Sequence, residues 1–523
     1  MSKLTDYTTY ADAQRLFSTD RLWELFDGNR ERLNIGHECV DRHAVPGRTA
    51  LRIAHADGSD ETITFEELAS WSSRFAHWLA EEGIQQGDRV AIMLEPSLPF
   101  YAALFGVMKR GAVAVPLFTL FGPDGVRLRI RDCEPALLLT THGKAAALSG
   151  LDGPRVLATD AAFMAALAVF PNRYEPRTAS ADMAIFQYTS GTTREMPDAI
   201  RHTHRAVVVV MNAALYGTGL RPGDRFFCPS SPAWGHGLWH GTLAPLALGI
   251  ETGAYAGKFA AGRLLKALRD YGSTNLSAAA THYRMMKNHM TEDAGRTANH
   301  DMELRKLSFT GEPIDQETST FIQAAFGAPL CSMYGTTEIG VVLANYPGAA
   351  DFPIKAGSLG RPVPGVAVEV QRPDGSKCAA DELGEIKVRR HDAWFPTKDR
   401  GRIDADGYFY HAGRTDDVII SAGWTMSAVE IEEALLGHKA VLAAAVIGVP
   451  DPLRGLVVKA FVVPAPGHAP DDATAADIQG FVRNRLSQHE YPRLISFVAD
   501  LPRTPAGKIN RKALRDQEAA PVA

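Results

Sequence analysis

The sequence predicts an α/β fold, in which a large amino-terminal domain of βαβ layers with parallel-rich sheets precedes a small carboxy-terminal α+β domain. Helical and strand periods alternate along the first two thirds of the chain. After about Asp406 the pattern changes to short strands, a polar turn and a compact α+β segment. The length of 523 residues and the hydrophobic content of 46% support several domains or subdomains with large cores.

The first βαβ layers are predicted between residues 64 and 117. Thr64 and Glu67 form a capping box at the start of FEELASWSSRFAHWLAEEG, a helix that Gly83 ends. RVAIML follows as a buried strand, PFYAALFGVMKRG as a helix and AVAVPL as another strand. This alternation favours a largely parallel sheet. The apolar face of the first helix consists of Phe65, Leu68, Phe75, Trp78 and Leu79.

The last hundred or so residues predict a separate small domain, which lies within the usual domain size range. A second capping box, from Ser427 to Glu430, begins a helix. The segments VLAAAVIGV and LVVKAFVV predict strands, and ADIQGFVRNRLSQH predicts a helix. The turn GRTDD is the expected hinge, so the predicted domains are residues 1–415 and 416–523.

Charge and cysteine content narrow the class of partner. A net charge of −5, with 55 basic residues spread along the chain, argues against a nucleic-acid or polybasic membrane surface and favours a small-molecule partner. The five cysteines are widely separated and include no CxxC pair, so they suggest neither a disulfide framework nor a zinc site. The amino terminus lacks the apolar stretch of a signal peptide, and the longest apolar runs are too short for a membrane span. We therefore expect a soluble cytoplasmic protein.

Three polar segments have the composition of a nucleotide site. Thr189-Ser190-Gly191-Thr192-Thr193 follows the apolar AIFQ and offers backbone N–H groups and hydroxyls to phosphate oxygens, although an ordinary turn has the same composition. Tyr334-Gly335-Thr336-Thr337-Glu338 ends in a carboxylate suited to Mg²⁺, with a solvated surface glutamate as the alternative. Lys508, in PAGKINR, is a cation that could reach a developing negative charge, or an ordinary surface lysine.

Taken together and in this order, these segments closely resemble the adenylate-forming superfamily of acyl-CoA synthetases, nonribosomal-peptide adenylation domains and luciferases. The resemblance covers nearly the whole chain. It implies ATP-dependent activation of a carboxylic acid to an acyl-adenylate, with release of pyrophosphate, followed by transfer to coenzyme A. ATP, Mg²⁺, coenzyme A and a small carboxylic acid are the implied ligands, and the chain is expected to be a monomer or a homodimer. The matching segments are GDRVAIML, KRGAVAVPL, YTSGTT, SSPAWGHG, FTGEP, MYGTTE, GSLGRPVPG, ELGEIKV, DGYFYHAGRTDD, SAGWTMSAVEIEEAL and PRTPAGKINRKAL.

The resemblance also implies roles for individual nucleotide-site residues. The loop Thr189 to Thr193 would hold the ATP phosphates, and Gly311, Glu312 and Pro313 would border adenine. Tyr334 would stack near the base, in the same turn as Gly335 and Thr336. Thr337 would contact a phosphate and Glu338 would bind magnesium. Asp399 would bind both ribose hydroxyls, although the family usually has glycine at Lys398, and Arg414 would help to hold ribose and phosphate.

The resemblance assigns the mobile parts to the carboxy-terminal domain. Lys508 matches the lysine that bridges the substrate carboxylate and the α-phosphate during adenylation, and it also matches a position that lysine-capping enzymes modify. Asp416 matches the hinge at which the small domain rotates before thioester formation. Gly423 matches the position that leaves room for the pantetheine arm.

One segment departs from the family. After TSGTT the family usually continues with glycine, one variable residue, proline and lysine, whereas this chain has Arg194-Glu195-Met196-Pro197-Asp198. We hypothesise that Arg194 supplies the positive charge lost at Asp198, because a guanidinium binds phosphate in bidentate fashion. A solvent-exposed arginine is the alternative.

The acid pocket is predicted around Trp234, His236 and His282. The segment SSPAWGHG lacks the aspartate that pairs with the amino group in peptide adenylation domains, so an acid without an α-amino group is favoured. His240 and Tyr283 join the three residues in a pocket suited to an aryl or cyclic acid, or all five pack the core. The GEP sequence at Gly311 resembles acetyl and medium-chain acyl-CoA synthetases more than peptide adenylation domains. Two other functions stay open: loading of a separate carrier protein, and noncatalytic nucleotide binding.

Overall fold

The computed structural model describes residues 3–148, 150–188, 199–292, 302–336, 339–390, 392–414, 418–421, 424–451, 455–486, 491–503 and 509–519. The chain forms two compact units. The first contains Met1–Pro313, Glu317–Ile354 and Pro362–Gly365, and the second contains Ile314–Gln316, Lys355–Arg361 and Val366–Ala523. The predicted boundary between residues 415 and 416 lies outside the described residues and stays a prediction.

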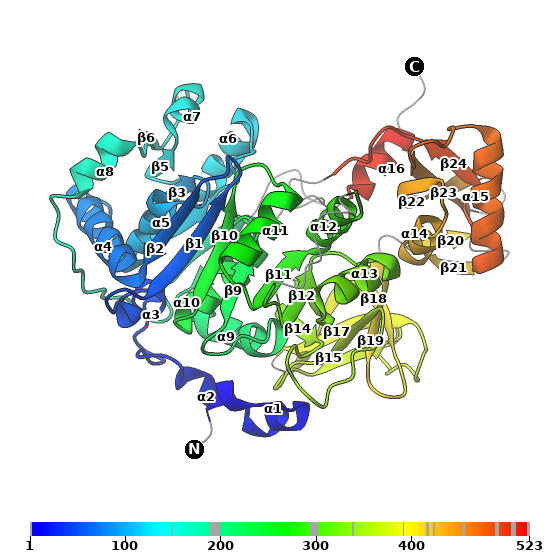
Figure 1. Ribbon diagram of the computed structural model, residues 1–523, viewed down its shortest axis with the longest axis horizontal. Helices are drawn as coiled ribbons and strands as arrows, with labels where there is room; N and C mark the ends of the chain where they lie inside the picture. Colours follow the sequence, from blue (N-terminus) through cyan, green and yellow to red (C-terminus); the bar gives the residue numbers. More distant parts are fainter. Residues whose placement is uncertain are drawn as a thin grey trace. The chain divides into compact units, whose positions relative to one another are not determined.

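The first unit contains two sheets made mostly of parallel strands. Its strands are β1 (Thr49–His55), β2 (Asp60–Thr64), β3 (Arg89–Met93), β4 (Val113–Pro116), β5 (Leu137–Thr140), β6 (Arg155–Ala158), β7 (Met183–Tyr188), β8 (Ala199–Thr203), β9 (Arg225–Cys228), β10 (Glu251–Ala256), β11 (Asn275–Ala279), β12 (Lys306–Thr310), β13 (Leu330–Thr336) and β14 (Gly340–Ala344). Figure 1 shows β10, β9, β11 and β12 side by side in that order.

The two sheets share one design, in which parallel strands are joined by helical crossovers. Within the first unit, one sheet has the order β14-β13-β12-β11-β9-β10-β1-β2, and the other has the order β6-β5-β3-β4-β7-β8. Among the described strands of the first unit, β14, β2 and β8 are the ones that pair with a neighbour in antiparallel fashion. The predicted α/β class with parallel-rich sheets is therefore confirmed.

The helices of the first unit cover both sheets and include two π-helices. They are η1 (Leu4–Asp6), α1 (Tyr10–Leu16), α2 (Thr19–Trp23), α3 (Ile35–Cys39), η2 (Asp41–His43), α4 (Phe65–Glu81), α5 (Leu98–Arg110), α6 (Pro123–Cys133), α7 (His142–Ala147), α8 (Ala161–Leu167), α9 (Ala206–Asn212), η3 (Ala213–Gly217), η4 (His236–Leu243), α10 (Ala244–Ala247), α11 (Ala261–Asp270), α12 (Ala280–Glu292) and α13 (Gln316–Phe326). The π-helices are η3 and η4.

Local sequence signals correctly predicted the helices α4 and α5. The Thr64 hydroxyl accepts a hydrogen bond from the Glu67 N–H at 3.1 Å, and the Glu67 carboxylate accepts one from the Thr64 N–H at 2.9 Å. This capping box starts α4, whose five predicted apolar residues are all buried. The next helix, α5, packs against α4 and ends at Gly111.

The second unit consists of an antiparallel sheet and an α+β layer. Its elements are β15 (Ser358–Pro362), which begins in this unit, β16 (Val368–Gln371), β17 (Gly384–Arg390), β18 (Ala393–Ile403), β19 (Phe409–Arg414), β20 (Val418–Ser421), β21 (Trp424–Ser427), α14 (Ala428–Leu436), β22 (Val441–Asp451), β23 (Gly455–Pro464), α15 (Asp472–Arg485), β24 (Leu494–Phe497) and α16 (Arg511–Ala519). The antiparallel sheet has the order β16-β17-β18-β19-β15.

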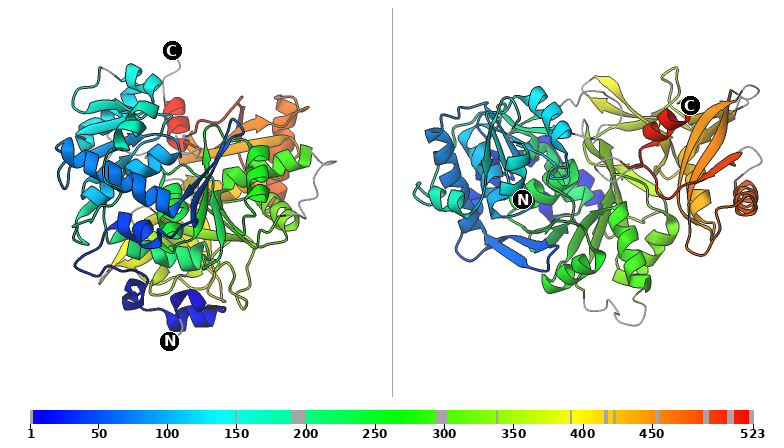
Figure 2. Two further views of the ribbon diagram at one scale, coloured as in Figure 1. Left: turned by 60° about the vertical axis from the view of Figure 1, so that its left-hand side comes forward. Right: turned by 90° about the horizontal axis from the view of Figure 1, so that it is seen from above.

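The α+β layer is built on the long pair of antiparallel strands β22 and β23. The helices α14 and α15 pack on one face of this pair through Ile431, Leu435, Ile478 and Val482. Leu514 of α16 packs on the other face. Figure 2 shows the two long orange strands from two further sides. The two helices and two strands predicted in this part of the chain are present, and α15 begins four residues before the predicted segment ADIQGFVRNRLSQH.

No helix among the described residues is both long enough and apolar enough to cross a bilayer. The five cysteines are all buried and free.

Candidate active site

The candidate site residues of the first unit follow the carboxyl ends of four neighbouring parallel strands. Trp234 and His236 follow β9, His282 follows β11, Gly311 follows β12, and Tyr334 lies near the end of β13. The chain leaves β9 toward β10 on one side, whereas it leaves β11 toward β12 on the other side. Open α/β sheets bind ligands outside the carboxyl ends of strands at such a reversal of strand order.

His236 lies across this reversal point. Its Nδ1 is hydrogen-bonded to the Ser230 hydroxyl at 3.0 Å, and its Nε2 to the Ser277 hydroxyl at 2.8 Å. Ser230 follows β9 and Ser277 belongs to β11, so the imidazole connects the two strands. His236 is 3% exposed, and burial holds its pKa well below the usual value. The ring is therefore uncharged, and both of its nitrogens are used inside the protein.

The π-helix η4 begins at His236 and passes close to the preceding loop. A Cβ atom on Gly237 would lie 2.2 Å from the Ser231 carbonyl oxygen and 2.3 Å from that of Ser230. Only glycine allows the helix to start this close to the loop. Trp234, just before the helix, packs edge-on against His236 with ring centroids 5.4 Å apart. The Trp234 ring is thus oriented by a histidine that is itself held by two serines.

The same π-helix is anchored to β7. Trp239 Nε1 donates a hydrogen bond to the Gln187 side chain at 2.9 Å, and the His202 ring packs against Trp239 at 4.7 Å. Gln187 stands two residues before Thr189, where the predicted phosphate loop begins. The acid segment is therefore bonded to β7, the strand after which the predicted phosphate loop begins.

His282 and Glu312 follow β11 and β12, on the other side of the reversal point. The His282 ring packs against Phe259 at 4.5 Å, and its Nδ1 accepts a hydrogen bond from the Ala279 N–H at 3.3 Å. Glu312 accepts a hydrogen bond from Arg284 at 2.9 Å and one from the Thr281 hydroxyl. The negative charge of Glu312 is therefore paired with Arg284. Because Thr281 and Arg284 both belong to α12, these bonds hold that helix against the Gly311-Glu312-Pro313 segment.

Two of the predicted nucleotide-site residues, Gly311 and Thr336, have structural features that suit a binding site. Gly311 has φ = 97°, a left-handed conformation that favours glycine, at the end of β12. Thr336 Oγ1 is buried and has no hydrogen-bond partner among the described residues. An unpaired buried hydroxyl is costly in an empty site, and it is an available contact for a polar ligand. Tyr334 and Gly335 precede it in β13.

Two predicted ribose residues lie in the second unit. Asp399 is 6% exposed, and it stands opposite Arg414 in the register of β18 and β19. His411 Nε2 lies 3.7 Å from the Asp399 carboxylate. Lys398 has φ = 63°, a conformation that strains any residue with a Cβ atom. This conformation gives a physical reason for the glycine that resembling proteins usually have at this position.

Several predicted site residues lie outside the described residues, so their roles stay predictions. They are Thr189, Ser190, Gly191, Thr192, Thr193, Arg194, Thr337, Glu338, Asp416, Gly423 and Lys508.

Sequence reasoning missed the residues whose hydrogen bonds fix the position of the candidate site residues. Ser277 is a polar side chain inside the strand NLSAA, between Leu276 and Ala278, and a buried serine in such a strand needs a partner. Gln187 likewise stands in an apolar strand and is 1% exposed. Tyr283 is fully buried, and its hydroxyl donates to the carbonyl oxygens of Leu276 and Ser308 at 3.3 and 3.0 Å. Tyr283 therefore packs in the core between β11 and β12. Core packing was the alternative to a place in the acid pocket for this residue.

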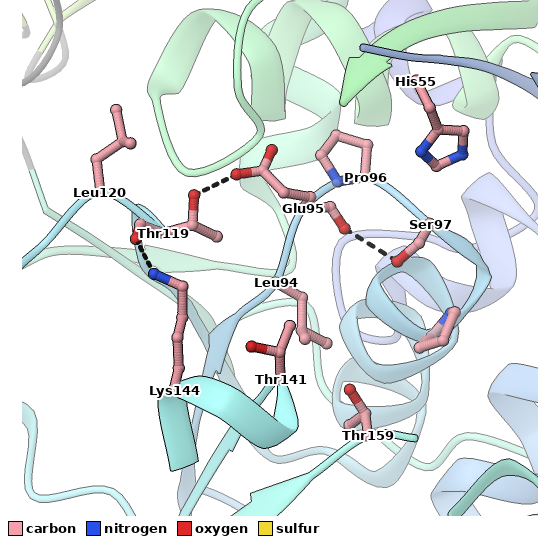
Figure 3. A pocket seen from close by; sticks show the side chains of 11 residues that line it. His55, Leu94, Glu95, Pro96, Ser97, Thr119, Leu120, Thr141, Lys144 and Thr159 are labelled. Atoms are coloured by element: carbon pink, nitrogen blue, oxygen red, sulfur yellow. Dashed lines mark hydrogen bonds between the residues drawn. The ribbon is translucent and has the colours of Figure 1, made fainter. Parts of the chain in front are cut away.

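A cavity of about 400 Å³ lies at the carboxyl ends of β3, β5 and β6 (Figure 3). It also stands where the strand order reverses, here between β3 and β5. The Glu95 carboxylate accepts hydrogen bonds from the Thr119 hydroxyl and from the Gly257 N–H, while Lys144 Nζ donates to the Thr119 carbonyl oxygen. These contacts fix the loops that line the cavity, and no sequence motif indicated them.

Buried histidines around η4 give the fold a defined dependence on pH. Burial lowers the pKa of His240 from 6.5 to about 4. Between these values the unfolded chain binds a proton that the folded imidazole does not, so stability is complete above pH 6.5 and falls as the pH drops toward 4. One such group contributes up to about 1.4 kcal/mol per pH unit in this window. We expect urea unfolding between pH 7.5 and 4.5 to show a smaller pH slope for His240→Phe, and an unchanged slope would contradict this assignment.

Comparison with known proteins places the chain in a family. The AMP-binding enzyme model matches residues 40–393, and the AMP-binding enzyme C-terminal domain model matches residues 430–508. The uncharacterized acyl-CoA ligase YtcI of Bacillus subtilis (strain 168) is 30% identical over 515 residues, which cover 93% of this chain and 96% of that protein.

Solved structures agree with this placement. The acyl-CoA synthetase of Brucella canis is 33% identical and superposes with a TM-score of 0.76, covering 98% of this chain and 99% of that one. The anthranilate CoA ligase AuaEII, in complex with anthranoyl-AMP, is 26% identical with a TM-score of 0.83, covering 96% and 99%. The chain belongs to the AMP-binding enzyme family, in the acyl-CoA synthetase branch of the adenylate-forming enzymes. The resemblance drawn from the motifs is confirmed.

Proposed function

We propose that this protein ligates an aryl, cyclic or medium-chain carboxylic acid to coenzyme A in an AMP-forming reaction. In the first half-reaction a carboxylate oxygen attacks the α-phosphorus of ATP, and pyrophosphate leaves. In the second, the thiol of coenzyme A attacks the acyl carbon, the thiol proton is lost, and AMP leaves. Membership of the acyl-CoA synthetase branch supports both half-reactions.

The observation that supports this function best is the placement of Trp234, His236 and His282 after the carboxyl ends of β9 and β11, where the strand order reverses. Trp234 is aromatic, and burial keeps the imidazoles of His236 and His282 uncharged. The nearby carboxylate of Glu312 is already paired with Arg284. A planar or cyclic acid without an amino group next to its carboxylate suits these side chains by stacking and by their lack of charge.

The site-residue roles form part of the same proposal. Thr189 to Thr193, with Arg194, bind the ATP phosphates, while Gly311, Glu312, Pro313 and Tyr334 border the base. Asp399 and Arg414 hold the ribose, Lys508 neutralises charge at the α-phosphate, and Gly423 leaves room for pantetheine after rotation at Asp416.

The metal expected in the first half-reaction is Mg²⁺, held by Glu338. The described neighbour Thr336 fits such a site, because its buried hydroxyl oxygen lacks a protein partner and magnesium takes oxygen ligands and bound waters. When bound, Mg²⁺ offsets the negative charge of the phosphates. Thr336 and Thr337 then orient the nucleotide through their hydroxyls.

The experiment that tests the function measures pyrophosphate release with benzoic, cyclic and short- to medium-chain acids, each with and without coenzyme A. We expect release with one class of acid, and acyl-CoA formation only when coenzyme A is present. Acid-dependent release without turnover on free coenzyme A would favour loading of a carrier protein instead. No release with any acid would contradict the proposal and favour a noncatalytic nucleotide-binding protein.

The departure in the phosphate loop has its own test. Replacing Arg194 with alanine is expected to raise the KM for ATP about tenfold, because a charge-assisted phosphate contact is lost. The KM for the acid should change little, since the acid binds elsewhere. Steady-state kinetics with each substrate varied in turn distinguish the two constants, and an unchanged KM for ATP would identify Arg194 as a solvent-exposed side chain.

A further inference from the structure

The segment Gly311-Glu312-Pro313 leaves the sheet at the carboxyl end of β12 and belongs to no helix or strand. Gly311 and Pro313 are exposed, and Gly311 has a left-handed backbone conformation. A segment outside regular structure needs bonds from its neighbours to stay in one position. The side chains that make those bonds therefore decide where this segment lies.

Arg284 holds the segment at two points. Its Nη1 donates a hydrogen bond to the Glu312 carboxylate oxygen Oε1 at 2.9 Å, and its Nη2 donates to the Pro313 carbonyl oxygen at 2.6 Å. The Thr281 hydroxyl, three residues earlier in α12, donates to the same Oε1 atom. Because a guanidinium has its donors in a fixed planar fork, two such contacts set the orientation of the segment as well as its distance from the helix.

The helix α12 is itself attached to the sheet. The hydroxyl of the buried Tyr283 is bonded to the carbonyl oxygens of Leu276 in β11 and Ser308 in β12. Arg284, the next residue, therefore extends from a fixed support. The pair of Arg284 with Glu312 is only partly exposed, with 33% and 18% of the two side chains accessible, so solvent screens it less than a surface pair.

We propose that Arg284 is a positioning residue for the nucleotide, which acts through Glu312 and Pro313 to place the segment that borders the base. The inference rests on the proposed function, which assigns this border to residues 311–313. An ordered border lowers the entropy that has to be lost when a ligand binds. Arg284 should therefore strengthen the binding of every ligand that contains adenine, and it should have no effect on a ligand without a base.

The test measures dissociation constants for MgATP, AMP and pyrophosphate by isothermal titration calorimetry, in the absence of any acid. Arg284→Met should raise the constants for MgATP and AMP by a similar factor of about tenfold, because the segment loses its two-point attachment. The constant for pyrophosphate, which has no base, should stay at the wild-type value. Repulsion by the unpaired Glu312 carboxylate would weaken all three ligands, so pyrophosphate distinguishes charge from position.

Two further variants and a control define the cause. Arg284→Lys keeps the charge but loses the planar fork, so it should retain part of the loss. Thr281→Val removes one hydroxyl with little change in volume, and we expect about a threefold effect on both adenine nucleotides. Lys287→Met is the matched control, because Lys287 belongs to the same helix but pairs with Glu317 of α13 at 2.6 Å. It should bind all three ligands as the wild type does.

Three results would overturn the inference: wild-type affinities in Arg284→Met, an equal loss of affinity for pyrophosphate, or the same loss in Lys287→Met. The proposed function can fail separately. If no acid releases pyrophosphate but Arg284→Met weakens MgATP and AMP alone, the ligase function is wrong and the positioning role stands. If the wild type forms acyl-CoA and Arg284→Met binds both nucleotides normally, the ligase function stands and the positioning role is wrong.

Discussion

Replacing Lys508 with alanine is expected to lower the rate of acid-dependent pyrophosphate release by roughly 10²- to 10³-fold, the usual effect of losing one group that stabilises transition-state charge. The attacking carboxylate and the pentavalent phosphorus are both negative, and this lysine is the cation that the family resemblance assigns to them. Transfer of the acyl group from a supplied acyl-adenylate to coenzyme A should continue, because this step breaks no bond to pyrophosphate. Single-turnover assays of the two half-reactions measure the difference.

The neighbouring Lys512 provides the matched control. It is exposed at the start of α16 and pairs with Asp516 at 2.7 Å, one helical turn away. Lys512→Ala should leave both half-reactions close to wild type. Equal loss of both half-reactions in Lys508→Ala would assign the lysine a structural part, and full adenylation activity would contradict the role altogether.

The largest expected effect on stability comes from Lys109. This side chain is fully buried in α5, and its ammonium pairs with Asp41 at 2.5 Å and donates to the Ser73 hydroxyl at 3.1 Å and the Ala69 carbonyl oxygen at 3.2 Å. Lys109→Met leaves the Asp41 carboxylate without its cation, and the loss of one partner from a buried pair costs about 3–5 kcal/mol. Urea unfolding at neutral pH should show this loss in the transition of the first unit.

The double variant Lys109→Met with Asp41→Asn tests whether the unpaired Asp41 carboxylate causes the loss of stability. It removes the stranded charge, so it should recover part of the lost stability. Lys266→Met is the control, because Lys266 is 60% exposed and its pair with Asp270 is a surface contact within one helix. If Lys109→Met unfolds at the same urea concentration as Lys266→Met, the pair contributes nothing to stability.

Local sequence signals were sufficient for most helices and strands. The Thr64 capping box, the apolar face of α4 and the runs RVAIML and AVAVPL depend on neighbouring residues alone, so their period and their caps predicted them directly. The order of motifs along the chain was sufficient for the family, because each motif is a short continuous segment. The π-helix at His236 was not predicted, since nothing in its local pattern distinguishes it from an α-helix.

The sequence by itself determined the fold class, the family and the residue types that could bind a nucleotide and an acid. Only the tertiary structure decided which of the histidines are already satisfied, because Ser277 is far from Ser230 and His236 in the sequence and meets them only where β9 and β11 pair. The same holds for Gln187 with Trp239 and for Asp41 with Lys109. Hydrogen bonds between distant segments depend on which strands become neighbours, and that choice is made by the packing of the whole sheet and not by any local pattern.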